Sequence, residues 1–166
     1  MKRIVLLRHA KSTHSETGLA DFNRPLNRRG IEEALAAGNW LKQNKIKPQT
    51  LYSSLAIRCV HTSTIVMQIL KIKYDNLIAM SDLYETNQGN IIKTIQQTEN
   101  KTNTILLCNH NPLLDDIVKK VMSDDNVQFT TGSISIFNYN SPSWSNFDFE
   151  NCSADKIMIN QKNISS

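Results

Sequence analysis

A chain of 166 residues with 40% hydrophobic residues, 20% charged residues and a net charge of +4 is typical of a single globular domain with a hydrophobic core. No apolar run approaches the roughly 20 residues that a membrane-spanning helix needs, and the first apolar run ends at Arg8, too early for a signal peptide. Three widely spaced cysteines without a CxxC pair favour neither a disulfide framework nor a structural zinc site. We therefore expect a cytoplasmic protein without a membrane partner.

The first half of the chain has the pattern of two strand–helix units. Residues 2–7 are an apolar run typical of a buried parallel strand, and a long loop rich in turn formers follows it. Asn27 can cap a helix that runs to about Asn44, because apolar residues recur there at helical spacing. A weaker strand over 50–54 leads into a second helix, which we expect Ser54 to cap.

The second half continues the alternation and ends in a hairpin. A short strand near "NLIAM" and a short helix precede "NTILLC" (103–108), the second strongly buried strand. Pro112 stands at a first-turn position of the next predicted helix. Residues 133–139 and 144–150 flank the turn cluster "NSPS" and predict an antiparallel hairpin. The domain is then expected to span residues 1–152, with a polar C-terminal tail over 153–166.

Strands that alternate with helices imply a mostly parallel sheet covered on both faces, so the predicted fold is a three-layer α/β/α sandwich. In such sheets the ligand site lies beyond the carboxyl ends of the strands. Arg8 and His9 directly follow the first strand, Arg58 follows the second, and His110 follows the strand over 103–108. We therefore expect these four side chains to meet at one edge of the sheet.

Two arginines and two histidines at one edge would repel each other unless an anion joined them. The first 30 positions also carry seven lysines and arginines against two acidic residues, a charge asymmetry that attracts anions. Nucleic-acid binders usually interleave aromatic residues with the basic ones or contain a known module, and this sequence shows neither. A phosphoryl group is the better match, because the planar fork of arginine fits its oxygens.

His9 is the predicted nucleophile. A neutral imidazole is a competent nucleophile, and cationic neighbours disfavour its protonation. We expect His9 to attack phosphorus while Arg8, Arg58 and His110 hold the equatorial oxygens, after which water hydrolyses the phosphohistidine intermediate. No cysteine is followed six positions later by arginine, as a cysteine phosphatase requires. No glycine-rich loop ends in GK[ST], the pattern of an ATP-type phosphate-binding loop. The reaction requires no metal.

Five motifs in order resemble the histidine phosphatase superfamily, which has the phosphoglycerate mutase-like fold. They are "LLRHAKS" (6–12), "DFNRPLNRRG" (21–30), "SSLAIRCVHT" (53–62), "LYE" (83–85) and "NHNP" (109–112). Together they are similar to the SixA-type phosphohistidine phosphatases, over residues 2 to about 144.

The resemblance implies that His9 is the phosphorylated residue and that Arg8, Arg58 and His110 form the phosphate pocket. It also implies that Glu85 matches the carboxyl group that protonates the leaving group in larger members, and that no metal or cofactor is needed. Four further residues are predicted to contact substrate: Lys11, Ser12, Arg24 and Asn111. Lys11 and Ser12 could instead shape the loop, and Arg24 could form a structural pair with Asp21.

No large capping insertion follows the Arg58 helix, which favours an open site suited to a protein substrate. The sequence therefore predicts a monomeric phosphohistidine phosphatase that acts on a phosphorylated protein of the histidine phosphotransfer type. One alternative is the same chemistry on a small phosphomonoester, such as a sugar phosphate or nucleotide. The other is a non-catalytic phosphate-binding module, although the intact His9 disfavours it.

Overall fold

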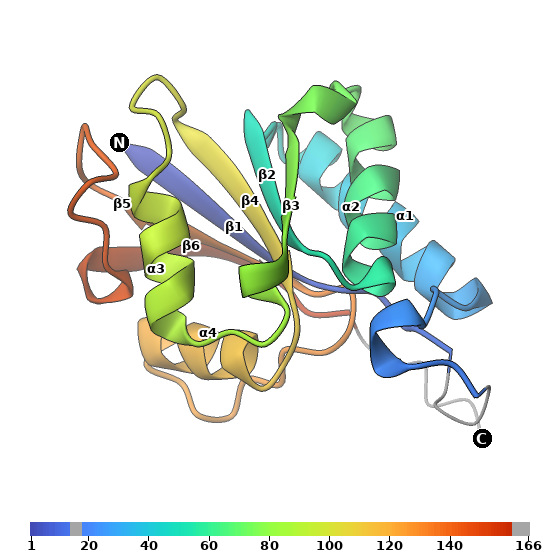
Figure 1. Cartoon of the computed structure of the whole chain (residues 1–166). Coiled ribbons are helices and arrows are strands. Elements are labelled where there is room, and N and C mark those ends of the chain that lie inside the picture. Colours follow the sequence, from blue (N-terminus) through green and yellow to red (C-terminus); the bar gives the residue numbers. More distant parts are fainter. Residues whose placement is uncertain (14–17, 161–166) are drawn as a thin grey trace.

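A computed structural model describes residues 1–13 and 18–160, and within these ranges the chain forms a six-stranded sheet flanked by helices (Figure 1). The strands are β1 (Lys2–Arg8), β2 (Thr50–Ser54), β3 (Leu77–Met80), β4 (Thr104–Asn109), β5 (Ile134–Tyr139) and β6 (Cys152–Met158). The helices are α1 (Arg28–Gln43), α2 (Ile57–Leu70), α3 (Gln88–Gln96) and α4 (Leu113–Met122). The strand order is β3-β2-β4-β1-β5-β6, in which β1 to β4 run parallel and β5 and β6 are antiparallel to their neighbours.

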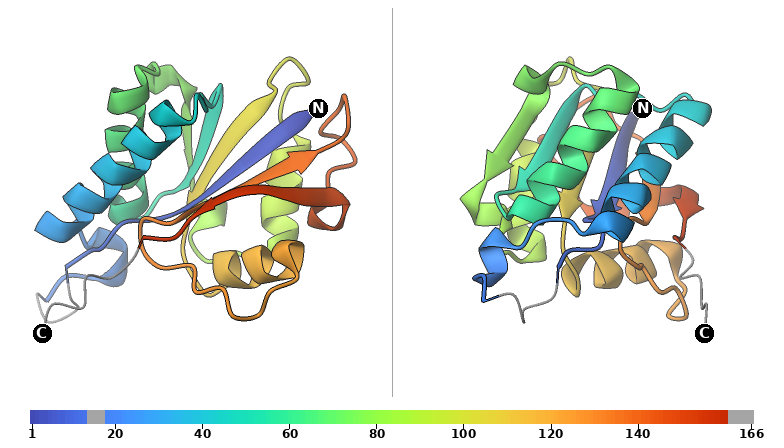
Figure 2. Two further views of the ribbon diagram at one scale, coloured as in Figure 1. Left: turned by 180° about the vertical axis from the view of Figure 1, so that it is seen from behind. Right: turned by 90° about the vertical axis from the view of Figure 1, so that its right-hand side faces the viewer.

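Helices cover both faces of this sheet. Figures 1 and 2 show α1 and α2 on one face and α3 and α4 on the other. Successive residues of β1 alternate between the two layers: Val5 and Leu7 pack with α1 and α2, while Ile4 and Leu6 pack on the opposite side. The predicted three-layer sandwich with a mostly parallel sheet is confirmed.

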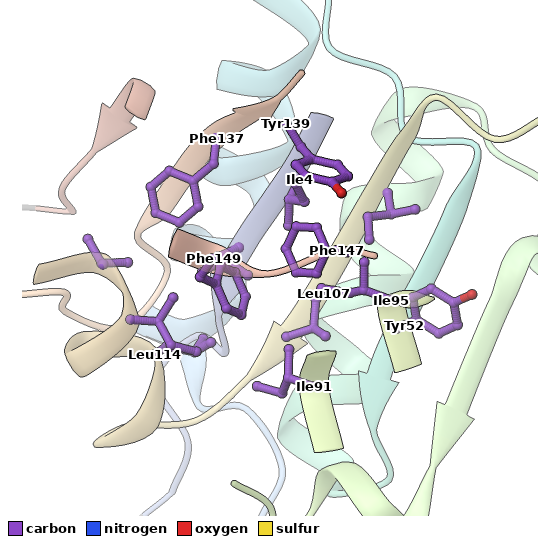
Figure 3. Close-up of a cluster of buried hydrophobic side chains, with 14 of the residues drawn as sticks. Ile4, Tyr52, Ile91, Ile95, Leu107, Leu114, Phe137, Tyr139, Phe147 and Phe149 are labelled. Atoms are coloured by element: carbon purple, nitrogen blue, oxygen red, sulfur yellow. The ribbon is translucent and has the colours of Figure 1, made fainter. Parts of the chain in front are cut away.

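The layer beneath α3 and α4 holds a cluster of aromatic rings (Figure 3). Phe137 and Tyr139 from β5 meet Trp144, Phe147 and Phe149 from the following connection, with ring centroids 5.0 to 6.5 Å apart. Four of these contacts are edge-to-face and the Tyr139–Trp144 pair is stacked, and both arrangements add to the free energy of burying each ring. This cluster anchors the antiparallel end of the sheet.

The C-terminal region differs from the prediction. Residues 144–150 are not a strand, because their aromatic side chains turn into the core and the 3₁₀ helix η5 (Phe149–Asn151) follows. The last strand is β6, and residues 153–158, predicted as tail, pair with β5. An edge strand is half exposed and therefore polar, so its sequence lacks the apolar alternation of a buried strand. Residues 161–166 of the predicted tail lie outside the described residues.

The start of α1 fixes the loop that follows β1. Asn27 caps the helix as predicted, because its side chain accepts a hydrogen bond from the Gly30 N–H at 2.9 Å. A Cβ atom at Gly30 would lie 1.9 Å from the Lys11 carbonyl oxygen, so only glycine allows this close approach. The buried Glu33 accepts from the Lys11 N–H at 2.9 Å. The backbone next to His9 is thus held on α1.

Candidate active site

The carboxyl end of the parallel strands surrounds a hollow of about 510 Å³. Nine predicted site residues line it: Arg8, His9, Lys11, Ser12, Arg24, Arg58, Glu85, His110 and Asn111. Four further lining residues are Thr13, Asp21, Tyr84 and Thr131. The structure therefore brings together side chains from the first, second and fourth strand ends, as the order of elements predicts.

His9 is 8% exposed, and its ring is held in one tautomer. Its Nδ1 atom lies 2.9 Å from the Ala10 carbonyl oxygen. Because a carbonyl oxygen only accepts, Nδ1 carries the proton and Nε2 keeps a lone pair. Burial lowers the pKa of His9 to about 3, aided by the charges of Arg58, His110 and Arg8 and opposed by the Ala10 bond. His9 is therefore neutral near pH 7, with Nε2 available as a nucleophile.

His110 faces His9 edge-on, with ring centroids 5.6 Å apart. Its Nδ1 atom lies 3.4 Å from Arg58 Nη2, and its Nε2 atom lies 3.0 Å from Ser54 Oγ. A guanidinium group only donates, so Nδ1 accepts, and the proton of the neutral ring lies on Nε2 and is donated to Ser54. Burial, and then the charge of Arg58, lower the pKa of His110 to about 4.

Ser54 does not cap α2, contrary to the prediction, because Ala56 occupies the N-cap position. Its hydroxyl oxygen instead accepts from the Ala56 N–H at 3.2 Å and meets His110. Serine at this position therefore orients a site residue rather than a helix end.

Both arginines keep buried donors that the described part of the chain does not satisfy. Arg8 Nη1 donates to the Phe129 carbonyl at 2.8 Å, and Arg58 Nη1 donates to the Asp21 carbonyl at 2.6 Å. The Nε atoms of four arginines are buried without a hydrogen-bond partner among residues 1–13 and 18–160: Arg3, Arg8, Arg24 and Arg58. Three of the four, Arg8, Arg24 and Arg58, line the hollow, where an oxyanion would supply acceptors for guanidinium donors.

The remaining predicted residues occupy the wall and rim of the hollow. Arg24 Nη2 pairs with Asp21 Oδ1 at 2.6 Å, which is the structural pair considered from the sequence. Asn111 Nδ2 donates to the Phe129 carbonyl at 3.0 Å, and Glu85 is exposed at the rim. Ser12 forms an isolated antiparallel bridge with Leu26, so its backbone shapes the loop.

The sequence interpretation missed Tyr84 and the second role of Asp21. Tyr84 donates its hydroxyl to Asp21 Oδ2 at 2.9 Å, and its ring lies 5.8 Å from that of His110. Asp21 also pairs with Arg58, at 2.9 Å between Oδ2 and Nη2. Tyr84 adjoins Glu85 in "LYE" and Asp21 begins "DFNRPL", so motif position was the available signal for both.

A comparison with sequence models of protein families assigns this chain to a family. The model of the histidine phosphatase superfamily (branch 1) matches residues 4–101. The chain belongs to the histidine phosphatase superfamily. An uncharacterised protein of Mycobacterium tuberculosis is 33% identical over 106 residues, which are 64% of this chain. The alignment spans 63% of that relative's length.

Three solved phosphatase structures share the fold of this chain. A SixA protein from Agrobacterium tumefaciens has a TM-score of 0.79 at 20% identity and covers 95% of this chain and 97% of its own. The protein histidine phosphatase SixA complexed with tungstate has a TM-score of 0.79 at 21% identity, and the match covers 95% of this chain and 96% of the SixA chain. A mycobacterial glucosyl-3-phosphoglycerate phosphatase has a TM-score of 0.64 at 12% identity, covering 96% and 98%. Within the described residues, no helix is long and apolar enough to span a membrane.

Proposed function

We propose that this protein is a phosphohistidine phosphatase that removes the phosphoryl group from a histidine of another protein through phosphorylated His9. One observation carries the proposal: a neutral His9, whose Nε2 atom keeps its lone pair, lies in a hollow where the Nε donors of Arg8 and Arg58 have no partner among the described residues. Phosphoryl transfer requires mainly alignment and stabilisation of charge on the phosphoryl oxygens, and this site supplies both.

The reaction proceeds in two displacements. His9 Nε2 attacks phosphorus, the bond from phosphorus to the substrate imidazole breaks, and that imidazole takes a proton from water or from a carboxyl at the rim. Water then attacks phosphorus on His9, the bond to Nε2 breaks, and inorganic phosphate leaves with restoration of the neutral ring. A phosphoryl dianion beside His110 would raise its pKa, so this second histidine could donate to the phosphoryl oxygens.

Two features support a protein substrate. Two exposed apolar side chains adjoin residues that line the hollow: Phe22, 37% exposed, follows Asp21 and packs edge-on against Tyr84, and Ile57, 40% exposed, precedes Arg58. Exposed apolar groups at the rim of a site fit a macromolecular partner better than a small sugar phosphate. The SixA structures, one of which is described as a protein histidine phosphatase, also have higher TM-scores than the sugar-phosphate phosphatase.

The test compares a phosphorylated histidine phosphotransfer domain with p-nitrophenyl phosphate as substrates. His9→Ala should abolish turnover of both, and His61→Ala, which removes a histidine of α2 outside the hollow, should retain it. Mass spectrometry at alkaline pH should detect a phosphoryl group on His9 during turnover. Preference for the small ester would favour the phosphomonoester alternative. Tight phosphate binding without any turnover would indicate a binding module instead.

A further inference from the structure

We propose that Asp21 is a positioning residue: it holds the outer end of the Arg58 guanidinium so that the Nε–Nη2 edge of that group faces the phosphoryl pocket. The inference rests on the proposed function for its meaning, since a phosphoryl group is the expected ligand of this edge. Asp21 begins the 3₁₀ helix η2 (Asp21–Asn23) and lies 37 positions before Arg58 in the chain.

The two contacts with Asp21 leave the Nε side of the Arg58 guanidinium unoccupied by Asp21. Nη1 donates to the Asp21 backbone carbonyl at 2.6 Å, and Nη2 donates to Asp21 Oδ2 at 2.9 Å. Of the five N–H groups of a guanidinium, these contacts use two at the outer end. Nη2 donates its second N–H to His110 Nδ1 at the long distance of 3.4 Å, and Nε finds no partner among the described residues. The edge next to His110, which lines the hollow, therefore carries one donor without a partner, on Nε, and one weakly held donor, on Nη2.

Arg8 presents its donors in a related way. A backbone carbonyl, that of Phe129, holds its Nη1 atom at 2.8 Å, while its Nε atom stays without a partner in the described ranges. Arg58 differs because a carboxylate is added to the carbonyl, and because both come from one residue of a surface segment. Two guanidinium groups anchored through Nη1 can present their Nε edges to the same oxyanion without a prior rearrangement, which is electrostatic preorganisation.

Asp21 is itself fixed on two further sides. Arg24 donates to Oδ1 at 2.6 Å, and the Tyr84 hydroxyl donates to Oδ2 at 2.9 Å. The Tyr84 ring packs edge-on against Phe22 at 5.0 Å and against His110 at 5.8 Å. Although partial burial raises it, the hydrogen bonds from Tyr84 and Arg58 leave the pKa of Asp21 below its ordinary value. The carboxylate is therefore charged and held in place at neutral pH.

The central experiment uses Asp21→Asn, which removes the charge and keeps the backbone carbonyl. Isothermal titration calorimetry with tungstate and kinetics with p-nitrophenyl phosphate should both show a loss of about tenfold, as expected for a charge-assisted hydrogen bond. The same substitution in an Arg58→Ala background should have almost no effect, because a residue that acts through Arg58 has nothing left to position. Asp75→Asn is the matched control, since Asp75 is an exposed aspartate of another 3₁₀ helix, η3 (Tyr74–Asn76).

Two results would overturn the inference. Tighter tungstate binding by Asp21→Asn would mean that the carboxylate competes with the anion for Arg58. An equal loss with and without Arg58 would mean a general structural role. If Asp21→Asn does not fold, Tyr84→Phe removes the other hydrogen bond to Oδ2, and its smaller loss should also disappear in the Arg58→Ala background. Tungstate affinity requires no turnover, so a wild-type protein that binds tungstate but hydrolyses nothing would contradict the proposed function alone.

Discussion

Strand β1 begins and ends with a cation, and the two cations have opposite surroundings. Lys2 is 1% exposed, and its three N–H groups have acceptors in Asn100 O at 2.5 Å, Thr102 O at 2.9 Å and Asn103 Oδ1 at 3.4 Å. Arg8 at the other end is half-buried and has a carbonyl acceptor for Nη1, while its Nε atom has none in the described part of the chain. A buried cation whose N–H donors all have acceptors stabilises the fold. A cation with a donor that lacks an acceptor lowers the stability of the fold, but that donor is available to a ligand.

The largest effect should come from the unsatisfied end. Arg8→Met removes donors that the proposed function assigns to the phosphoryl oxygens, so kcat/KM for p-nitrophenyl phosphate should fall about 10²- to 10³-fold. The free energy of unfolding should stay the same or rise, because an incompletely paired cation is replaced by an apolar side chain of similar length. Steady-state kinetics and urea unfolding on one preparation measure both. If Arg8→Met lowered the free energy of unfolding and left kcat/KM unchanged, Arg8 would contribute to the fold as Lys2 does, which would contradict the contrast between the two ends of β1.

Lys2→Met makes the reciprocal change at the satisfied end of the same strand. The loss of three hydrogen bonds leaves the Asn100 carbonyl without the lysine donor, so the free energy of unfolding should fall by about 1–3 kcal/mol. Thr102 O retains the Trp144 Nε1 donor at 2.8 Å, which limits the loss. Urea unfolding measures this change, and kcat/KM of the folded variant should equal that of the wild type. A large loss of kcat/KM in folded Lys2→Met would show that the two ends of β1 are not independent.

The sheet edge that carries the candidate site was predictable because strand order alone determines it. Buried apolar runs identify β1 and β4, and carboxyl ends of parallel strands must meet, so Arg8, His9 and His110 follow from position in the sequence. The same logic does not apply to Asp21. It lies in a segment without apolar periodicity that folds into the short 3₁₀ helix η2, and only the folded chain determines which of several nearby cations it contacts.

The antiparallel end of the sheet was harder to predict for a different reason. The aromatic residues between β5 and β6 enter the core from a connection rather than from a strand, and apolar content alone cannot distinguish the two. The edge strand β6 has a mostly exposed, polar pattern that resembles a tail. Its pairing with β5 depends on a tertiary contact that the pattern does not encode.

Acidic pH should lower the free energy of unfolding, because His9 in the candidate site is buried in its neutral form. The folded pKa of His9, about 3, lies below the ordinary value of 6.5, so between these values the unfolded chain binds a proton that the folded chain does not. Stability must therefore fall as pH falls through this window, by about 2 kcal/mol between pH 6.5 and pH 5 for this histidine. Urea unfolding at the two pH values should show that the free energy of unfolding of His9→Gln falls by correspondingly less than that of the wild type. An unchanged pH dependence would show that His9 is not the buried neutral group described above.

The smallest effect is expected at Glu85, which is exposed at the rim. General acid catalysis contributes about 10²- to 10⁴-fold when the leaving group is poor, as in an alkyl phosphate. The imidazole of phosphohistidine is a good leaving group and needs little help. Glu85→Gln should therefore change kcat by less than about threefold with a phosphohistidine protein, but reduce it strongly with phosphoserine. A strong and equal reduction on both substrates would show that Glu85 acts on a step they share, such as attack of water on phosphorylated His9, and would move this residue from the leaving-group side of the site to the phosphoryl pocket itself.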